Sequence, residues 1–262
     1  MVSAAAATTE VATGLLEAVD VTKNFGGVRA LRGVSLRLPE HEIIGLIGPN
    51  GSGKTTLLNC ISGVFPPTSG EILLDGQRLT ERGGHRVARA GVVRTFQNIR
   101  LFGALTALQN VEVGALGAGR VRRARSRAYA LEVLEQLGIA ELADRWAGTL
   151  SYGDQRRLEV ARALAGAPRF LLLDEPAAGM NESESEELRA SIERIRSDRK
   201  CGILVVEHDL RLIMRLCDSI YVLNQGEVIS HGTPEEVRSD PAVVAAYIGE
   251  EERGVKPKGR AE

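Results

Sequence analysis

The residues best suited to chemistry form one run, 48–55, which reads Gly-Pro-Asn-Gly-Ser-Gly-Lys-Thr. It fits the pattern G-x-x-x-x-G-K-[ST] at every fixed position, after an apolar stretch and before a helical one. Its glycines let backbone N–H groups turn inward around a phosphate, Lys54 adds a positive charge, and the hydroxyl of Thr55 suits Mg²⁺. A glycine-rich turn with an incidental lysine, the alternative, does not account for this context. We therefore predict a loop that binds the phosphates of a nucleotide, with Mg²⁺ as cofactor, through seven residues: Gly48, Asn50, Gly51, Gly53, Lys54, Thr55 and Thr56.

Two carboxylates, Asp174 and Glu175, follow the apolar run Phe-Leu-Leu-Leu at 170–173. An α/β sheet presents its ligands at the carboxyl ends of its strands. At such a place one carboxylate can hold Mg²⁺ through water, and the next can orient or deprotonate an attacking water molecule. Taken alone, two acids after a strand most often form a solvated loop, but beside a phosphate-binding loop they indicate nucleotide hydrolysis. We therefore assign Asp174 to the metal and Glu175 to the base.

The elements that must position these groups follow from hydrophobic periodicity. Three short apolar runs, 43–47, 170–173 and 203–206, are typical of central parallel strands covered on both faces. Alternating stretches at 15–21 and 34–38 indicate antiparallel strands with one wet face, and Asn-Gln-Gly at 224–226 indicates a second hairpin. Helices are expected at 54–61, 126–137, 154–165 and 182–195, whereas 98–149 shows no clear strand. Strands that alternate with helices predict an α/β fold, here with a helical insertion.

A third motif reads Leu-Ser-Tyr-Gly-Asp-Gln-Arg-Arg at 150–157, at the start of a predicted helix. It resembles the signature motif of ABC ATPases, commonly LSGGQ. Other motifs of that family follow in the expected order: Phe25 before the phosphate-binding loop, Arg-Thr-Phe-Gln ending at Gln97, and Val-Val-Glu-His-Asp around His208. The resemblance covers about residues 15–249. It implies a P-loop NTPase core of the ABC type, with an antiparallel β subdomain and an inserted α-helical subdomain at about 98–150.

The resemblance also implies a role for each matched residue. Phe25 resembles the aromatic residue that stacks on adenine. Gln97 resembles the residue that reaches Mg²⁺ and the attacking water from a mobile loop, which adds it to Thr55 and Asp174 as a metal contact. Glu175 resembles the catalytic base, and His208 resembles the switch that bonds the γ-phosphate and orients Glu175.

Two signature residues, Ser151 and Gly153, resemble the groups that bind the γ-phosphate held by a partner subunit, where a hydroxyl and a helix N-terminus suit an anion. Two such subunits would then enclose two ATP molecules. Three residues depart from the family pattern: Tyr152 replaces glycine, Asp154 replaces glutamine, and Asn181 stands where aspartate is frequent. A carboxylate at 154 suits a helix N-terminus but would repel a phosphate, so we expect its side chain to turn away.

These departures, with Asp-Glu-Pro-Ala-Ala-Gly-Met-Asn at 174–181 and Ala-Tyr-Ile-Gly-Glu at 246–250, resemble the ATP-binding subunits of branched-chain amino acid importers. The implied partners are a second ATPase subunit, in a homodimer or heterodimer, transmembrane permease subunits and, indirectly, a solute-binding protein. The same motor could serve a urea or short-amide importer or a lipopolysaccharide extractor. An alternative of another class is a non-transport ABC protein acting on ribosomes or DNA, which would normally carry two cassettes or a long coiled-coil insertion. A non-hydrolysing regulatory subunit would not need Glu175 and His208.

Composition sets outer limits on the function. The 33 Lys and Arg residues nearly balance the 34 Asp and Glu residues, which argues against a nucleic-acid partner. The three cysteines lack metal-ligand spacing and fit a reducing compartment. No run of 18 apolar residues appears, so we expect that the chain does not span a membrane by itself. Together with this, the resemblance to importer subunits implies a peripheral protein on the cytoplasmic face of the cell membrane. We expect a disordered leader at 1–14, one ATP-binding domain at 15–250 and a disordered tail at 251–262.

Overall fold

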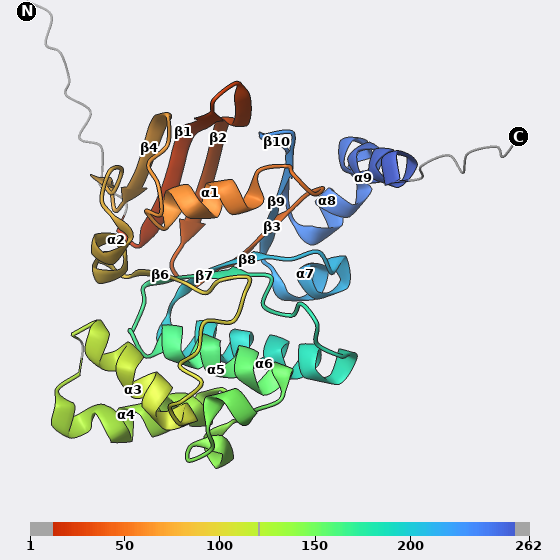
Figure 1. Cartoon of the computed structure of the whole chain (residues 1–262). Coiled ribbons are helices and arrows are strands. Elements are labelled where there is room, and N and C mark those ends of the chain that lie inside the picture. Colours follow the sequence, from red (N-terminus) through yellow and green to blue (C-terminus); the bar gives the residue numbers. More distant parts are fainter. Residues whose placement is uncertain (1–12, 120, 255–262) are drawn as a thin grey trace, which may run out of the picture.

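The computed structural model describes residues 13–119 and 121–254. These residues form a strand-rich part and a helical part, which meet along one large sheet (Figure 1). Most of the expected leader, 1–12, and most of the expected tail, 255–262, lie outside the described residues. Helix α9, Pro241–Gly254, continues past the expected domain end at residue 250. The Glu-Glu-Arg stretch that follows residue 250 favours helix, whereas glycine does not.

The larger sheet has six strands in the order β10-β9-β3-β8-β7-β6. All neighbouring pairs in it are parallel except β9 and β10, which form an antiparallel hairpin at the edge. Its strands are β3 (Ile43–Ile47), β6 (Val92–Arg94), β7 (Phe170–Asp174), β8 (Gly202–Val206), β9 (Ser219–Asn224) and β10 (Glu227–Gly232). Every residue of β3, β7 and β8 is buried, which confirms the prediction that the three apolar runs are central strands.

The smaller sheet is antiparallel and has the order β2-β1-β4-β5. Its strands are β1 (Leu15–Phe25), β2 (Val28–Pro39), β4 (Ser69–Leu74) and β5 (Gln77–Arg78). The stretches predicted at 15–21 and 34–38 lie inside β1 and β2, which are longer than expected. Along β2 the buried residues Leu36 and Leu38 flank the exposed Arg37, so one face of this sheet is covered and the other is wet.

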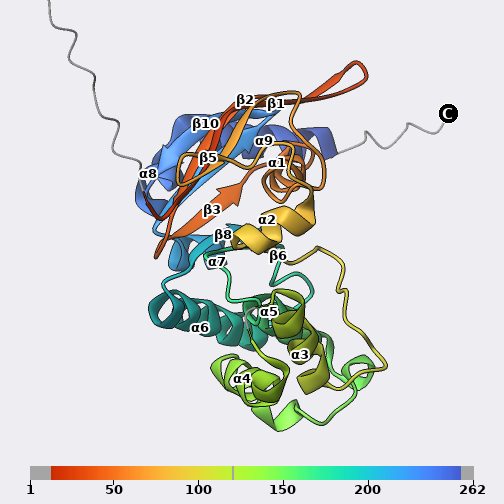
Figure 2. The same ribbon diagram turned by 90° about the vertical axis from the view of Figure 1, so that its left-hand side faces the viewer.

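Four helices gather at the end of the molecule away from the smaller sheet, as Figure 2 shows from a second direction. They are α3 (Ala107–Gly117), α4 (Arg123–Gln136), α5 (Tyr152–Leu164) and α6 (Glu182–Arg199), and two short 3-10 turns (Ala140–Leu142 and Ala147–Thr149) lie between α4 and α5. The remaining helices besides α9 are α1 (Lys54–Ile61), α2 (Gly84–Ala90), α7 (Leu210–Leu216) and α8 (Pro234–Ser239). Among the described residues, none of these helices combines the length and the apolar character needed to cross a membrane.

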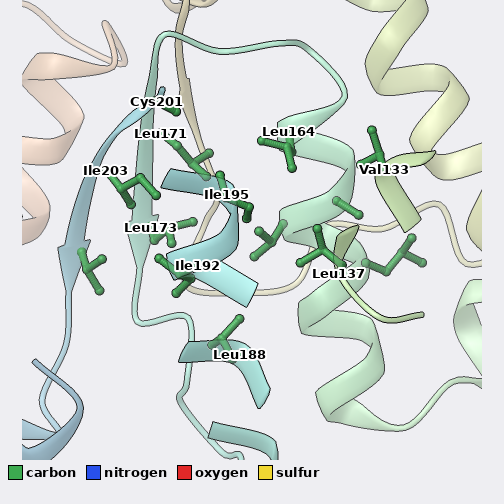
Figure 3. Packing of buried hydrophobic residues seen from close by; sticks show 14 of the residues in the cluster. Val133, Leu137, Leu164, Leu171, Leu173, Leu188, Ile192, Ile195, Cys201 and Ile203 are labelled. Carbon is green, nitrogen blue, oxygen red and sulfur yellow. The ribbon is translucent and has the colours of Figure 1, made fainter. Parts of the chain in front are cut away.

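The core lies on both faces of the larger sheet, because successive side chains of a strand point to opposite sides. On one face, Leu171 and Leu173 of β7 pack with α6 and the other helices (Figure 3). Helix α6 contributes Leu188, Ile192 and Ile195, whose spacing places them on one stripe. On the other face, Phe170 and Leu172 join α1 and the smaller sheet. The large sheet is therefore held between helices on one side and α1 with the smaller sheet on the other, and its strand ends carry the loops of the candidate site.

Candidate active site

The predicted phosphate-binding loop connects the end of β3 at Ile47 with the start of α1 at Lys54. Two of its glycines have no room for a side chain: a Cβ at Gly48 would lie 1.9 Å from the carbonyl oxygen of Leu223, and a Cβ at Gly53 would lie 2.7 Å from that of Ala30. Both also have left-handed backbone angles, with φ at 146° and 111°. The loop is thus pressed against the β9–β10 hairpin, whose Gly226 N–H donates to the carbonyl of Ser52 at 2.9 Å.

The interior of this loop suits an anion. Lys54 is 6% exposed, and its Nζ donates to the carbonyl oxygens of Gly48 at 2.7 Å and Pro49 at 2.9 Å. The Oγ of Ser52 is buried, and no hydrogen bond to it occurs within the described residues. No described side chain caps the N-terminus of α1. A buried hydroxyl and the N–H groups at a helix start are what a phosphate group requires.

A cavity of about 250 Å³ opens beside the loop. Its lining joins segments that are far apart in the sequence: Ala30, Asn50, Gly51, Gly53, Lys54, Thr55, Thr56, Gln97, Glu175 and His208. A Cβ added to Gly51 would meet no atom within 4 Å, so that side of the loop is open. Nine of the predicted site residues therefore line one cavity, and only Ala30 was not expected there.

Glu175 is the centre of the polar contacts in this cavity. Its Oε2 accepts from Nε2 of Gln97 at 2.9 Å, and its Oε1 lies 2.8 Å from Nε2 of His208. The three residues follow β6, β7 and β8, which are adjacent parallel strands, so their loops meet at one edge of the sheet. The arrangement presents one carboxylate, held by an amide and an imidazole, toward the phosphate-binding loop.

The backbone of Glu175 is held in a strained conformation. Its φ of 49° is left-handed, which costs a non-glycine residue roughly 1–3 kcal/mol. Its N–H donates to the carbonyl of Val206 at 2.8 Å and so extends the pairing of β7 with β8 by one residue. This pairing stabilises the conformation that turns the carboxylate into the cavity.

Asp174, assigned to the metal from the sequence, is 2% exposed and does not belong to the cavity lining. Its Oδ2 accepts from Nη2 of Arg94 at 2.7 Å, and the same guanidinium donates to Oδ1 of Asn59 at 2.6 Å. Within the described residues, no group of three or more His, Cys, Asp or Glu side chains is placed to hold a metal ion. Mg²⁺ needs no such group, because it usually takes one or two protein carboxylates and completes its shell with water and substrate phosphates.

Phe25 lies at the end of β1, outside the cavity lining, with 48% of its surface exposed. The centroid of its ring lies 5.4 Å from that of Phe65 in a T-shaped arrangement, and Nζ of Lys23 lies 5.2 Å from the Phe25 centroid. One face of an exposed aromatic ring beside a lysine is suited to a flat anionic ligand, so stacking on adenine stays a prediction for this residue.

Ser151 and Gly153 stand at the start of α5, away from the cavity. The Oγ of Ser151 accepts from the N–H of Asp154 at 3.2 Å and donates to the Asp154 carboxylate at 2.8 Å. That carboxylate also pairs with Arg157 at 2.6 Å, so it is bound within its own helix. Asn181 caps α6, where its Oδ1 accepts from the N–H of Glu184 at 2.9 Å. Both departures from the family pattern thus have partners inside the chain.

Comparison with known proteins decides the family. A family model described as "ABC transporter" matches residues 31–178, and a second one, described as "Branched-chain amino acid ATP-binding cassette transporter", matches 227–253. The high-affinity branched-chain amino acid transport ATP-binding protein BraF of Pseudomonas aeruginosa is 45% identical over 90% of this chain and 98% of its own length. The chain belongs to the ABC transporter ATP-binding family. LivG of Escherichia coli K12, which has the same description, is 46% identical over the same shares of the two chains.

More distant relatives agree with the ABC assignment. The lipopolysaccharide export system ATP-binding protein LptB of Escherichia coli K12 is 35% identical over 91% of the chain and 98% of its own length. An ATP-binding cassette of an ABC transporter, solved in its ADP conformation, superposes with a TM-score of 0.81 at 30% identity, covering 90% of this chain and 98% of its own. The predicted fold and the prediction of an ABC-type ATPase are therefore confirmed.

Sequence reasoning missed one buried acid of this ABC ATPase. Glu207 is 4% exposed, and it accepts from the N–H of Ala177 at 2.7 Å and from that of His208 at 3.1 Å. Burial raises the pKa of its carboxyl group. It therefore ties the loop after Glu175 to the loop that carries His208. The signal was present, since an acid directly follows an apolar strand and precedes the histidine.

Proposed function

We propose that this ABC ATPase is the motor subunit of an importer for branched-chain or other hydrophobic amino acids. The contact of Glu175 with both Gln97 and His208, inside the cavity of the phosphate-binding loop, carries the hydrolytic part of the proposal. The amino-acid cargo is supported by the names of BraF and LivG and by the subfamily match at 227–253. Identity to LptB is lower, at 35%, so lipopolysaccharide extraction is less favoured, as is a urea or amide importer.

In the proposed reaction, a water molecule attacks the γ-phosphorus of ATP in line with the departing ADP oxygen. Glu175 accepts the proton of that water and Gln97 orients it, while His208 holds the Glu175 carboxylate and contacts the γ-phosphate. The products are ADP and inorganic phosphate. The loop of residues 48–56 binds the phosphates, with Lys54 as the cation that offsets their charge, and Phe25 stacks on the adenine.

Thr55, Gln97 and Asp174 would hold Mg²⁺, which would neutralise charge on the β- and γ-phosphates. Thr55 and Gln97 line the cavity already. Asp174 would act through water while it keeps its bond to Arg94, because a carboxylate has enough lone pairs to accept from both.

Ser151 and Gly153 would bind the γ-phosphate of a second ATPase subunit, either another copy of this chain or a related one. Permease subunits would receive the motion of such a pair, and a separate solute-binding protein would deliver the cargo. Dimeric structures are known for a related cassette that is 29% identical to this chain, with a TM-score of 0.75 and coverage of 84% of this chain and 98% of that one. We place the assembly at the cytoplasmic face of the cell membrane, with this chain as its peripheral part.

The cargo is tested by uptake of labelled leucine, urea and acetamide in cells that lack this chain. We expect leucine uptake to fall and the other two to stay unchanged. Expression of the wild-type chain should restore leucine uptake, whereas the Glu175→Gln chain should not, although it reaches the same level in the cell. Normal leucine uptake together with lost urea uptake would reject the cargo and leave the ATPase assignment intact.

A further inference from the structure

A buried ion pair on α5 faces the loop that carries Gln97. Arg156 and Glu159 are 3% and 2% exposed, and Nη1 of Arg156 lies 3.3 Å from Oε2 of Glu159. The loop lies between β6 and α3, and it must bring the side chain of Gln97 onto Glu175. Neither charged residue lines the nucleotide cavity or belongs to the reaction described above.

Arg156 binds the main chain of this loop at the residue that matters for catalysis. Its Nη1 donates to the carbonyl oxygen of Phe96 at 3.0 Å, and its Nη2 donates to the carbonyl oxygen of Gln97 itself. A guanidinium is planar and carries its donors in a fixed fork, so contacts to two successive carbonyls restrict the direction of the peptide as well as its distance.

Glu159 binds the same loop three residues further on. Its Oε1 accepts from the N–H of Arg100 at 3.2 Å, while the carbonyl of Arg100 accepts from the guanidinium of Arg162. Burial raises the pKa of Glu159, and the nearby positive charges of Arg156 and Arg162 oppose that rise. One helix therefore holds both ends of the segment 96–100 through backbone atoms.

Tyr152, a departure from the usual signature glycine, extends these contacts toward Glu175. Its phenol oxygen accepts from Nη2 of Arg156 at 3.1 Å. Its ring lies against Gly179, where an added Cβ would be 3.0 Å from Cε1 of the tyrosine. Gly179 belongs to the loop that begins with Glu175, so α5 contacts both loops whose side chains meet in the cavity.

Ordinary packing does not explain two buried charges at this place. Replacing a buried ion pair by apolar residues of similar volume is often neutral or stabilising, so such a pair is weak evidence for a role in stability. Such a pair can instead fix the orientation of its neighbours, because hydrogen bonds to charged groups are strong and directional. Within the described residues, the hydrogen bonds that Arg156 and Glu159 make outside the pair and Tyr152 go to the backbone of one catalytic loop.

We propose that Arg156 and Glu159 are positioning residues that hold the Gln97 loop on the signature helix, so that the Gln97 amide stays on Glu175. The inference rests on the proposed role of Gln97 in hydrolysis. It also gives the signature helix a second role, because a change in its position, when Ser151 meets the nucleotide of a partner, moves the Gln97 backbone with it.

The first test measures amide hydrogen exchange in the full chain. Peptides spanning 96–102 should exchange at least about tenfold faster in Arg156→Met and Glu159→Ala than in wild type, because the loop loses its anchors. Glu159→Gln should stay near wild type, since its amide oxygen can still accept from the N–H of Arg100. The control is Arg194→Met on α6, which removes a guanidinium bond of 3.1 Å to the carbonyl of Gln136. Unchanged exchange in both anchor variants would overturn the proposal.

The second test is a kinetic double-mutant cycle with Gln97. Arg156→Met should lower kcat about 10- to 100-fold with less than about a threefold change in the KM for ATP, because the loop is displaced while the phosphate-binding loop is not. In a Gln97→Ala chain, the same change should lower kcat no further, since the group that it positions is already gone. A merely structural role would reduce activity by the same factor in both chains.

Every outcome of the cycle separates the inference from the proposed function. Equal losses in both chains, a normal kcat with faster exchange, or a lost thermal response to ATP in Arg156→Met would each overturn the positioning role. A normal kcat in Gln97→Ala alone would instead reject the catalytic role of Gln97, and exchange would still show whether the anchors exist. If Arg156→Met fails to fold, Arg156→Lys replaces it in both tests, because lysine keeps the positive charge but lacks the planar fork of donors. A kcat of Arg156→Lys equal to that of wild type would count against the proposal.

Discussion

Replacing Glu175 by glutamine removes a proton acceptor while leaving its surroundings nearly intact. The carboxylate contacts Nε2 of Gln97 at 2.9 Å and Nε2 of His208 at 2.8 Å. A glutamine at 175 has the same length, and its Oε1 can accept from Gln97 while its Nε2 donates to a neutral imidazole. The substitution therefore isolates the chemistry of the carboxylate from its contribution to structure.

The substitution should change the rate of hydrolysis much more than the stability of the fold. Loss of a general base lowers the rate by about 10²- to 10⁴-fold. In free energy of activation this is about 2.7 to 5.4 kcal/mol, at 1.36 kcal/mol for each factor of ten. The left-handed backbone of Glu175 is retained, and exchanging charged for neutral hydrogen bonds should change the free energy of unfolding by only about 1 kcal/mol.

The assay combines phosphate release with thermal unfolding and sizing chromatography. Glu175→Gln should release phosphate at least about a hundredfold more slowly. ATP should still raise its melting temperature, because the phosphate-binding loop is unchanged. Because the variant does not consume ATP, a closed dimer that contains ATP should accumulate. This dimer would form between two copies of the chain or between the chain and a related second ATPase. The control is Glu193→Gln, which removes a carboxylate from the ion pair with Arg189 on α6 and should turn over normally.

Two results would refute this reasoning. Near-normal phosphate release in Glu175→Gln would mean that another group accepts the proton. Loss of the ATP-dependent rise in melting temperature would mean that the carboxylate serves binding rather than chemistry.

Four further predictions concern other parts of the chain. Lys54→Ala should abolish the ATP-dependent rise in melting temperature, because the phosphates lose their buried cation; an unchanged rise would contradict the phosphate-binding loop. Mixing Lys54→Ala with Ser151→Arg chains should restore part of the ATPase activity of homodimers, since each mixed pair keeps one intact composite site, and full activity of Ser151→Arg alone would exclude a role in trans. We also expect a permease contact at Phe102, because it follows Gln97 in the same loop and its ring is 50% exposed. Phe102→Ala should keep nucleotide binding but uncouple leucine uptake from hydrolysis in the assembled transporter, whereas coupled uptake would exclude that contact. The hydrogen bond from Arg169 holds the pKa of Asp75 below its usual value. The ionised Asp75 side chain therefore stabilises the folded chain above about pH 4, and this stabilisation is lost as the pH falls through the lowered pKa. Asp75→Asn should thus lower the free energy of unfolding by about 1 kcal/mol at pH 7, with the difference from wild type vanishing in acid; a difference that persists there would contradict this origin.

The sequence predicts those strands that carry their own signal. The runs at 43–47, 170–173 and 203–206 are buried on both faces, so their apolar character is nearly continuous. The hairpin at 224–226 is predicted because Asn-Gln-Gly suits a tight turn, and Gln225 indeed has a φ of 48°. Motif order then assigns the phosphate-binding residues, Gln97, Glu175 and His208, nine of which meet in one cavity.

The rest depends on partners that are distant in the sequence. Strand β6, Val92–Arg94, is only three residues long, and it is a strand because β7 offers it a parallel edge. Strand β5 has two residues and exists through its pairing with β4. The same limit applies to the site, since nothing local in Asp174 indicates that Arg94, eighty positions away, holds its carboxylate.

Ser151 shows how a matched motif residue can already be engaged in the single chain. Its Oγ donates to the Asp154 carboxylate at 2.8 Å, and a hydroxyl has one proton to give. If Ser151 serves the nucleotide of a partner subunit as proposed, the γ-phosphate would compete with Asp154 for that proton. Arg157 forms an ion pair with the same carboxylate at 2.6 Å and offsets its charge. This weakens the competition of Asp154 for the Ser151 proton and the repulsion between Asp154 and a phosphate. On the proposed trans role, the aspartate that replaces the usual glutamine would oppose closure on ATP, and the arginine three residues later in α5 would limit that opposition.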